Sequence, residues 1–444
     1  MTAHVSFIQR IMKKASKIEA HELRAVLLSF AFVFTLMAAY YILRPVRDAM
    51  ASDWTDTEVS LLWNLNFFIS LGVVAIYGIA VSRLRFRVLV PGVYAFFAAS
   101  FIAFYLGVNQ LQDRVLIDKT FYIWVSVFSL FHVSVFWSFM SDLFTKEQSG
   151  RLFAFIAAGA SAGALVGPLI PTLFAGKLGT DQLLLIAAVM LVIPIPMILY
   201  LDRLKVIELH NDDVTADLST ARIGGKPFAG FKMFFTNPYL LAIGAFILLY
   251  TAIGSFVYFE QKNLLAEFDR ATRTQILGAV DWFVNVLTFA IGLFATSRIV
   301  TRFGMPVTLA LVPVFIAAGL LVLAFAPILT VVLALQVARR AGNYAITRPG
   351  REMLFTAVDR ETRFKAKPVI DIAVYRGGDA VSSLAFAGLT DGIGLGLGAM
   401  AAVGAGIASL WAFVGAFLGR RFERQGIEAG DESPPAADAA VTKV

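Results

Sequence analysis

Long apolar stretches alternate with short polar segments over most of the chain. Twelve of these stretches have the length of an α-helix that crosses a bilayer, about 20 residues. They cover residues 25–44, 58–81, 87–108, 119–144, 152–175, 182–201, 239–260, 274–297, 305–326, 328–347, 366–390 and 393–418. The pattern predicts an all-α polytopic membrane protein with twelve transmembrane helices.

Three short signatures recur about 211 to 216 residues after their first occurrence. The pairs are Thr35 and Thr251, Ser82-Arg83 and Ser297-Arg298, and Leu143-Phe144-Thr145 and Leu354-Phe355-Thr356. They predict two parallel six-helix halves, residues 23–201 and 238–418. A membrane protein built this way usually binds a substrate between its halves and rocks them around it, which favours a secondary transporter.

Polar segments flank the two predicted halves. We expect residues 1–22 to form a basic amphipathic segment on the membrane surface, residues 202–237 to link the halves, and residues 419–444 to be a disordered tail. The loop at residues 297–305, SRIVTRFGM, resembles the short basic loop that the major facilitator superfamily carries in each half. That resemblance implies a major facilitator-like fold.

Composition and charge agree with a membrane protein. Apolar residues make up 58% of the chain, the mean hydropathy is +0.75, and there is no cysteine for disulfides or metal thiolates. With the N-terminus inside, 29 of the 38 lysines and arginines lie in inner segments, 8 in outer segments and one, Arg376, within a span. This asymmetry predicts an inner-membrane protein with both termini in the cytoplasm, and it explains the net charge of +7 without nucleic acid.

Charged residues within spans are costly, so they tend to face a cavity or a partner. At the end of the first span, Arg44 can share a helical face with Arg47 or with Asp48, or these side chains can reach the outer headgroups. In the eighth span, Asp281 lies one turn before Asn285. The aspartate is placed either to contact an ion or substrate, or to pair with an arginine.

The tenth and eleventh spans carry further candidates. Gln336 and Arg340 share one face of the tenth, and Arg339 and Asn343 the neighbouring face, unless the arginines belong to the inner loop. The eleventh span carries Asp371, Tyr375, Arg376, Gly377, Gly378 and Asp379, in which Arg376 could contact an anion or clamp Asp379. His132, alone on the fourth span, could titrate near neutral pH or be a hydrogen-bonded structural residue.

The charges favour an anionic solute. The spans contain five arginines and four aspartates, a slight excess of positive charge. Guanidinium groups match the geometry of phosphate or carboxylate oxygens. A phosphate-binding glycine loop and a zinc spacing are both missing, so we expect a transporter and not an enzyme, without a cofactor or metal. We also expect the protein to be a monomer. As substrate contacts we expect Arg44, Arg47, Arg340, Asn343, Tyr375 and Arg376, and as coupling or gating residues His132, Asp281, Asp371 and Asp379.

Three segments resemble the bacterial and plastid ATP/ADP translocase family. Residues 348–371, RPGREMLFTAVDRETRFKAKPVID, are similar without a gap to its Pro-x-x-Lys/Arg-Glu-Met run followed by Asp-x-x-Thr, Lys-x-Lys and Ile-Asp. Residues 41–48, YILRPVRD, and residues 136–139, FWSF, are similar to the family at the first and fourth spans. The resemblance implies a nucleotide transporter, with ATP or ADP as possible partners.

The sequence also departs from that family. The acidic residues typical of its fourth and seventh spans are replaced, and its Gly-Lys-Ser-Gly-Gly appears as Arg376-Gly377-Gly378-Asp379. ATP/ADP exchange, proton-coupled nucleotide uptake and transport of another solute therefore remain open. A membrane scaffold or sensor with the same fold, contacting partners through residues 202–237, is the alternative outside transport.

Overall fold

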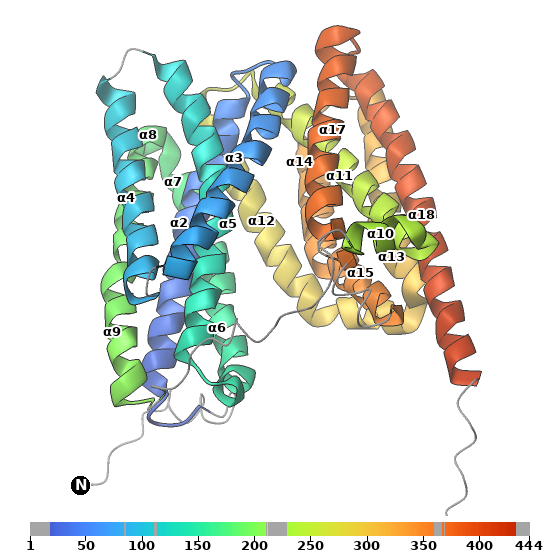
Figure 1. The fold of residues 1–444 in the computed structure, drawn as a ribbon. Coiled ribbons are helices and arrows are strands. Elements are labelled where there is room, and N and C mark those ends of the chain that lie inside the picture. Colours follow the sequence, from blue (N-terminus) through green and yellow to red (C-terminus); the bar gives the residue numbers. More distant parts are fainter. Residues whose placement is uncertain are drawn as a thin grey trace, which may run out of the picture. The chain divides into compact units, whose positions relative to one another are not determined.

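The structure is a computed structural model that describes residues 18–83, 86–110, 113–209, 211, 229–358, 366–367 and 369–431. Within these residues every regular element is a helix (Figure 1). The chain divides into two compact units. Unit 1 comprises Met1–Gly224 and Gln261–Val286, and unit 2 comprises Gly225–Glu260 and Leu287–Val444.

Unit 1 contains the helices of the first predicted half. They are α2 (Leu23–Ala51), α3 (Asp56–Arg83), α4 (Phe86–Gln110), α5 (Arg114–Leu143), α6 (Lys146–Val166), α7 (Leu169–Leu178), α8 (Thr180–Val192) and α9 (Pro194–Ile207). Helix α2 is central, because α5, α6, α8 and α9 all pack against it.

Glycines of α6 bring that helix close to the backbone of α2. A Cβ atom on Gly159 would lie 2.6 Å from the carbonyl oxygen of Phe30, and Gly163 faces the carbonyl oxygen of Phe34 in the same way. A larger residue at either position would collide with the α2 backbone, so glycine sets the distance between the two helices.

The remaining helices, three of which are π-helical, belong to unit 2, except for the end of α11 and most of α12. They are α10 (Ala229–Thr236), α11 (Pro238–Leu265), α12 (Arg270–Phe294), α13 (Thr296–Phe325), α14 (Leu329–Gly342), η1 (Asn343–Thr347), α15 (Arg348–Leu354), η2 (Phe355–Ala357), η3 (Val369–Val374), α17 (Tyr375–Ala387), η4 (Gly388–Gly392) and α18 (Leu397–Asp431). The π-helices η1, η3 and η4 flank α14 and α17. Such local changes of helical register are frequent at functional sites.

Helices α13 and α18 pack against each other in unit 2. Gly304 has a φ of 74°, which interrupts α13 near its start and is a backbone conformation that favours glycine. The next residue, Met305, donates its backbone N–H to Oε1 of Glu423 on α18 at 2.8 Å. Glu423 belongs to the segment 419–444, which the sequence predicts to be a disordered tail.

The structure corrects that prediction for part of the tail, because α18 continues to Asp431. The helix continues because it packs against α13, and the carboxylate of Glu423 on α18 accepts the backbone N–H of Met305. Residues 432–444 lie outside the described residues, as do 1–17 of the predicted amphipathic segment and 212–228 of the predicted linker. Helices α9 and α10 extend into the two ends of that linker.

Within the described residues, nine helices are long and apolar enough to cross a membrane. They correspond to nine of the twelve predicted spans. The other three coincide with α3, with α14 followed by η1, and with η3 followed by α17.

The contact units differ from the halves of the repeat at one place. Residues 261–286, the end of α11 and most of α12, belong to unit 1 although the repeat assigns them to the second half. The polar contacts of this segment explain the assignment.

Candidate functional site

The end of α2 carries two arginines that share one carboxylate. Nη2 of Arg47 lies 2.7 Å from Oδ1 of Asp48, and Nε of Arg44 lies 3.7 Å from its Oδ2. Arg47 also donates to the hydroxyl of Ser126 at 3.2 Å, and its guanidinium lies 5.4 Å from the ring centre of Tyr122. The Arg44–Asp48 contact follows the i,i+4 spacing that the sequence shows. Arg47 is fully engaged by α2 and α5.

Asp281 of α12 is also held by α2. Its Oδ1 lies 3.4 Å from Nη1 of Arg44, and the residue is only 3% exposed. One turn later, Asn285 accepts a hydrogen bond from the hydroxyl of Tyr41 and donates to the carbonyl oxygen of Ala164. The geometry favours the interpretation in which Asp281 pairs with an arginine, and that arginine comes from a different helix.

His132 lies among aromatic rings of unit 1. Its ring stacks on Tyr40 with centroids 4.6 Å apart and lies 5.3 Å from Phe128. Its Nδ1 is 3.0 Å from the carbonyl oxygen of Ser129, and the residue is buried. These contacts favour the structural interpretation of this histidine over a coupling role.

A buried arginine of α14 forms the centre of a polar group in unit 2. Arg339 is 7% exposed and donates to Oε1 of Gln336 at 2.7 Å through Nη2 and at 3.2 Å through Nε. Its guanidinium lies 5.8 Å from the ring centre of Tyr250 on α11. A Cβ atom on Gly254 would lie 3.1 Å from Nη1 of Arg339, so this glycine gives the guanidinium room beside α11.

No carboxylate oxygen of the described residues lies within 4.0 Å of the Arg339 guanidinium, and the groups that contact it directly, Gln336 and Tyr250, are neutral. Asp379 interacts with Arg339 only at longer range. The sequence pattern placed Gln336 on the face of Arg340, whereas the structure pairs it with Arg339. Arg340 is buried as well, and Asn343 begins the π-helix η1 at the end of the same helix.

Helix α17 adds three predicted site residues beside α11. The ring of Tyr375 lies 6.1 Å from that of Tyr250. Arg376 and Asp379 are half-buried, and they do not form an ion pair within 4.0 Å in the described part of the chain. Of the two interpretations of Arg376, this geometry disfavours the clamp on Asp379.

Serine, threonine and glycine hold α17 against α11. Ser382 and Ser255 share a hydrogen bond of 2.7 Å between their buried hydroxyls, and Gly378 faces the side chain of Thr251.

The sequence analysis named Arg339 and Gln336 without listing them as substrate contacts, and it missed Tyr250. The signal that could have found Tyr250 is its place on the seventh span, one turn before Gly254.

Asp371 lies apart from this group, in a cluster with α15. It is 3.5 Å from Nη2 of Arg351, which also contacts Glu352 at 3.1 Å. Lys367 donates to the other oxygen of Glu352 at 2.5 Å. Burial acts to raise the pKa of Glu352, but the hydrogen bonds from Lys367 and Arg351 outweigh it and hold the pKa below its ordinary value.

These four residues belong to the segment 348–371 that resembles ATP/ADP translocases, of which 359–365 and 368 lie outside the described residues. Their mutual ion pairs fix η3, from which α17 and its Tyr375 follow directly. The described part of the motif therefore positions the helix that carries Arg376.

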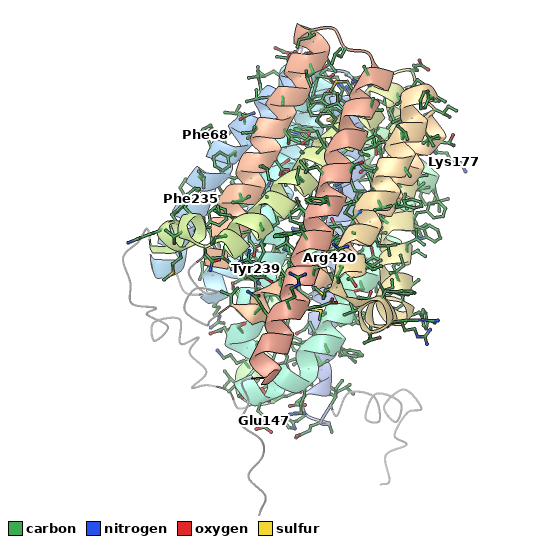
Figure 2. All side chains as sticks on the ribbon, turned by 90° about the vertical axis from the view of Figure 1, so that its right-hand side faces the viewer. Phe68, Glu147, Lys177, Phe235, Tyr239 and Arg420 are labelled. Carbon is green, nitrogen blue, oxygen red and sulfur yellow. The ribbon has the colours of Figure 1, made fainter. Side chains whose placement is uncertain are left out.

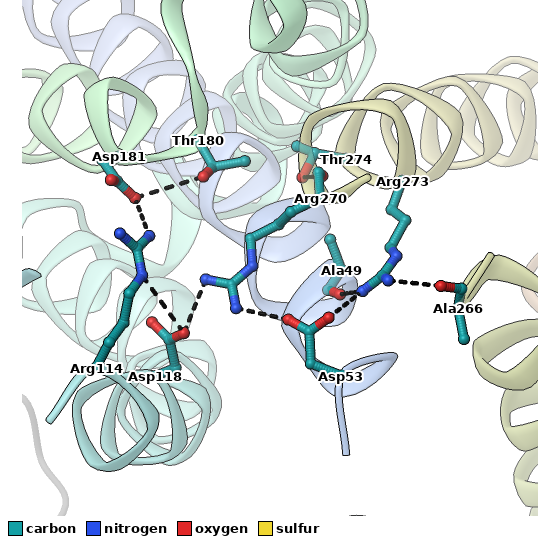
Figure 3. A network of polar contacts seen from close by, with 10 residues as sticks. All are labelled: Ala49, Asp53, Arg114, Asp118, Thr180, Asp181, Ala266, Arg270, Arg273 and Thr274. Atoms are coloured by element: carbon teal, nitrogen blue, oxygen red, sulfur yellow. Dashed lines mark hydrogen bonds and ion pairs between the residues drawn. The ribbon is translucent and has the colours of Figure 1, made fainter. Parts of the chain in front are cut away.

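A larger ion network joins the start of α12 to other residues of unit 1 (Figure 3). Arg270 of α12 contacts Asp53 at 2.6 Å and Asp118 at 2.8 Å, and Arg273 contacts Asp53 at 2.5 Å. Arg114 extends the network from Asp118 to Asp181.

Burial acts to raise the pKa of Asp53 in this network, but hydrogen bonds from Arg270 and Arg273 outweigh it and lower the pKa. Lys262 and Asp56, both buried, form a second contact of 2.7 Å nearby. These pairs explain why the end of α11 and the start of α12 group with the helices of unit 1.

The comparison with known families decides the class of protein. The model of the Major Facilitator Superfamily matches residues 26–347 of the chain. The chain belongs to this superfamily. It is therefore a facilitator-type secondary transporter of the membrane, which confirms the predicted fold class and the prediction that it is not an enzyme.

Solved facilitator structures have the same fold. The nucleoside transporter NupG is 12% identical, with a TM-score of 0.61 over 92% of this chain and 99% of that chain. The transporter PepTSo of the POT family is 13% identical, with a TM-score of 0.60 over 90% of this chain and 99% of that chain. A bacterial homologue of the human lysosomal transporter Spinster is 15% identical, with a TM-score of 0.54 over 92% and 99%.

At these identities the likeness shows the fold alone. A search of the curated proteins found no match. The facilitator family is thus shown, while the narrower resemblance to ATP/ADP translocases stays a prediction.

Proposed function

We propose that the protein transports an anionic metabolite by alternating access and that this metabolite is a nucleotide. The observation that carries the proposal is Arg339, a buried guanidinium whose near partners, Gln336 and Tyr250, are neutral. A buried charge is costly unless an opposite charge compensates it. An anionic substrate would supply that charge during transport.

The groups around Arg339 suit the two parts of a nucleotide. The rings of Tyr250 and Tyr375 offer aromatic faces for a base, and the guanidinium of Arg339 can hold two phosphate oxygens at once. Arg376 and Arg340 are further cations on α17 and α14. The motif resemblance to ATP/ADP translocases and the fold likeness to a protein described as a nucleoside transporter point the same way.

The other predicted site residues have different roles in this proposal. Arg44 and Arg47, which contact Asp48 and Asp281, would organise unit 1 more than bind substrate directly. Asp379, near the positive charges of Arg376 and Arg339, is our candidate for coupling. The protein would act as a monomer in the inner membrane with both termini in the cytoplasm.

Uptake of labelled ATP, ADP and AMP into liposomes holding the purified protein tests the proposal. We expect saturable nucleotide uptake by the wild type and a loss of about tenfold or more in Arg339→Lys, because lysine keeps the charge but loses the bidentate geometry. Arg298→Lys, at an exposed arginine of the same unit, is the matched control and should transport normally.

Two results would contradict the proposal. If the wild type takes up none of these nucleotides but takes up another anion, the substrate class is wrong. Full nucleotide uptake by a stably folded Arg339→Gln protein would remove Arg339 from the site.

A further inference from the structure

Helix α10 differs from the long helices of unit 2 in length and direction. It has eight residues, and Figure 2 shows it lying across the direction of α18, near the level of Arg420. Its phenylalanines divide between two environments. Phe234 is buried with its ring against Gly244, whereas the side chain of Phe235 is 66% exposed.

Basic side chains lie on α10 and on α18, and Figure 2 shows Arg420 near the level of Tyr239 and Phe235. Lys232 is exposed on α10 itself, and Arg420 is exposed on α18 directly after the apolar run that ends at Leu418. Arg421 places its guanidinium 5.8 Å from the ring centre of Tyr239, at the start of α11. None of these three cations forms an ion pair within 4.0 Å with a described residue.

One acid lies nearby but forms no ion pair within 4.0 Å with these three cations. Oε1 of Glu423, one turn after Arg420, accepts the backbone N–H of Met305. The surface therefore combines an exposed aromatic ring with cations at the point where an apolar helix ends. That combination matches a membrane interface, in which hydrocarbon and anionic headgroups lie side by side.

We propose that Lys232, Arg420 and Arg421 bind the headgroup of an anionic phospholipid while Phe235 packs against its acyl chain. The occupant is a lipid and not a free phosphate, because a free phosphate has no group for the exposed ring. This site is separate from the Arg339 group and does not depend on the transported substrate.

Native mass spectrometry of the full chain, titrated with phosphatidylglycerol or phosphatidylcholine of identical acyl chains, tests the site. We expect the wild type to retain phosphatidylglycerol preferentially. The double variant Lys232→Gln with Arg420→Gln should weaken this binding about five-fold for each cation removed. Both side chains are exposed and Arg421 is kept, so the variant should fold.

Two further variants separate the alternatives. Arg298→Gln with Arg302→Gln removes the same charge from exposed positions of the same unit and should leave the affinity unchanged. Phe235→Ser keeps every charge and should weaken lipid binding. An equal loss in the control pair would mean general attraction, and equal retention of both lipids would mean no headgroup site.

Inorganic phosphate provides the last arm of the test. If it displaces phosphatidylglycerol completely at the same concentration, or if Phe235→Ser binds as the wild type does, the site recognises phosphate alone and the lipid proposal fails. We expect neither result.

Discussion

Single residues show how far sequence reasoning reaches toward the site. The charged positions within the spans could be predicted, because their cost in a bilayer marks them. Their partners could not. Asp281 has no basic neighbour on its own helix, yet the packing of α12 against α2 gives it Arg44. Adjacent Arg339 and Arg340 look equivalent in the sequence, and only the position of α11 sets Tyr250 against Arg339.

A coupling test follows at this scale from the different surroundings of two aspartates. Asp281 has an arginine at 3.4 Å, whereas Asp379 has no ion-pair partner within 4.0 Å among the described residues. A carboxylate that lies near arginines without a close ion pair can bind and release a proton during the transport cycle. Asp379→Asn should therefore abolish nucleotide accumulation driven by a proton gradient but spare exchange between preloaded liposomes and medium.

Asp281→Asn is the comparison for that experiment. It leaves the half-buried Arg44 with less compensation, so we expect a lower melting temperature in detergent together with partial losses of both activities. If Asp379→Asn accumulates nucleotide like the wild type, Asp379 does not carry the coupling. If the wild type shows exchange but no accumulation, the transporter is an exchanger.

Helices depend on features that the sequence shows only in outline. The break between α6 and α7 falls at Gly167-Pro168, where proline lacks a backbone donor, within the predicted span 152–175. The π-helices around α14 and α17 have no comparable sequence signature. The glycines of α6 are visible in the sequence, although the helix they face is not. These glycines matter only because the backbone of α2 lies so close to them.

Gly163→Ala tests that closeness. The added methyl group would collide with the carbonyl oxygen of Phe34 and the side chain of Met37, so α6 and α2 would have to separate. We expect a loss of stability of about 1 to 3 kcal/mol, measured as a lower melting temperature in detergent.

Gly150→Ala in the same helix is its control. A Cβ atom there has nothing within 4 Å, so the change should be neutral or slightly stabilising, because alanine favours the helix. Equal melting temperatures of the two variants would contradict the packing described for α6.

For the whole molecule, hydropathy and the repeat predicted the class of fold, and the family match confirms it. The assignment of residues 261–286 to unit 1 could not be predicted, because it depends on ion pairs such as Arg270–Asp118 between helices distant in the sequence. The positive charge of the inner loops predicts an orientation that the fold alone does not give.

Orientation can be measured because the chain has no cysteine. Glu147 and Lys177 are both exposed, and Figure 2 shows them toward opposite ends of unit 1. The fifth predicted span separates them, with position 147 inside and position 177 outside. In intact cells, Lys177→Cys should react with an impermeant maleimide and Glu147→Cys should react only after lysis. Reaction of Glu147→Cys alone would invert the topology, and reaction of both would mean that no span lies between them.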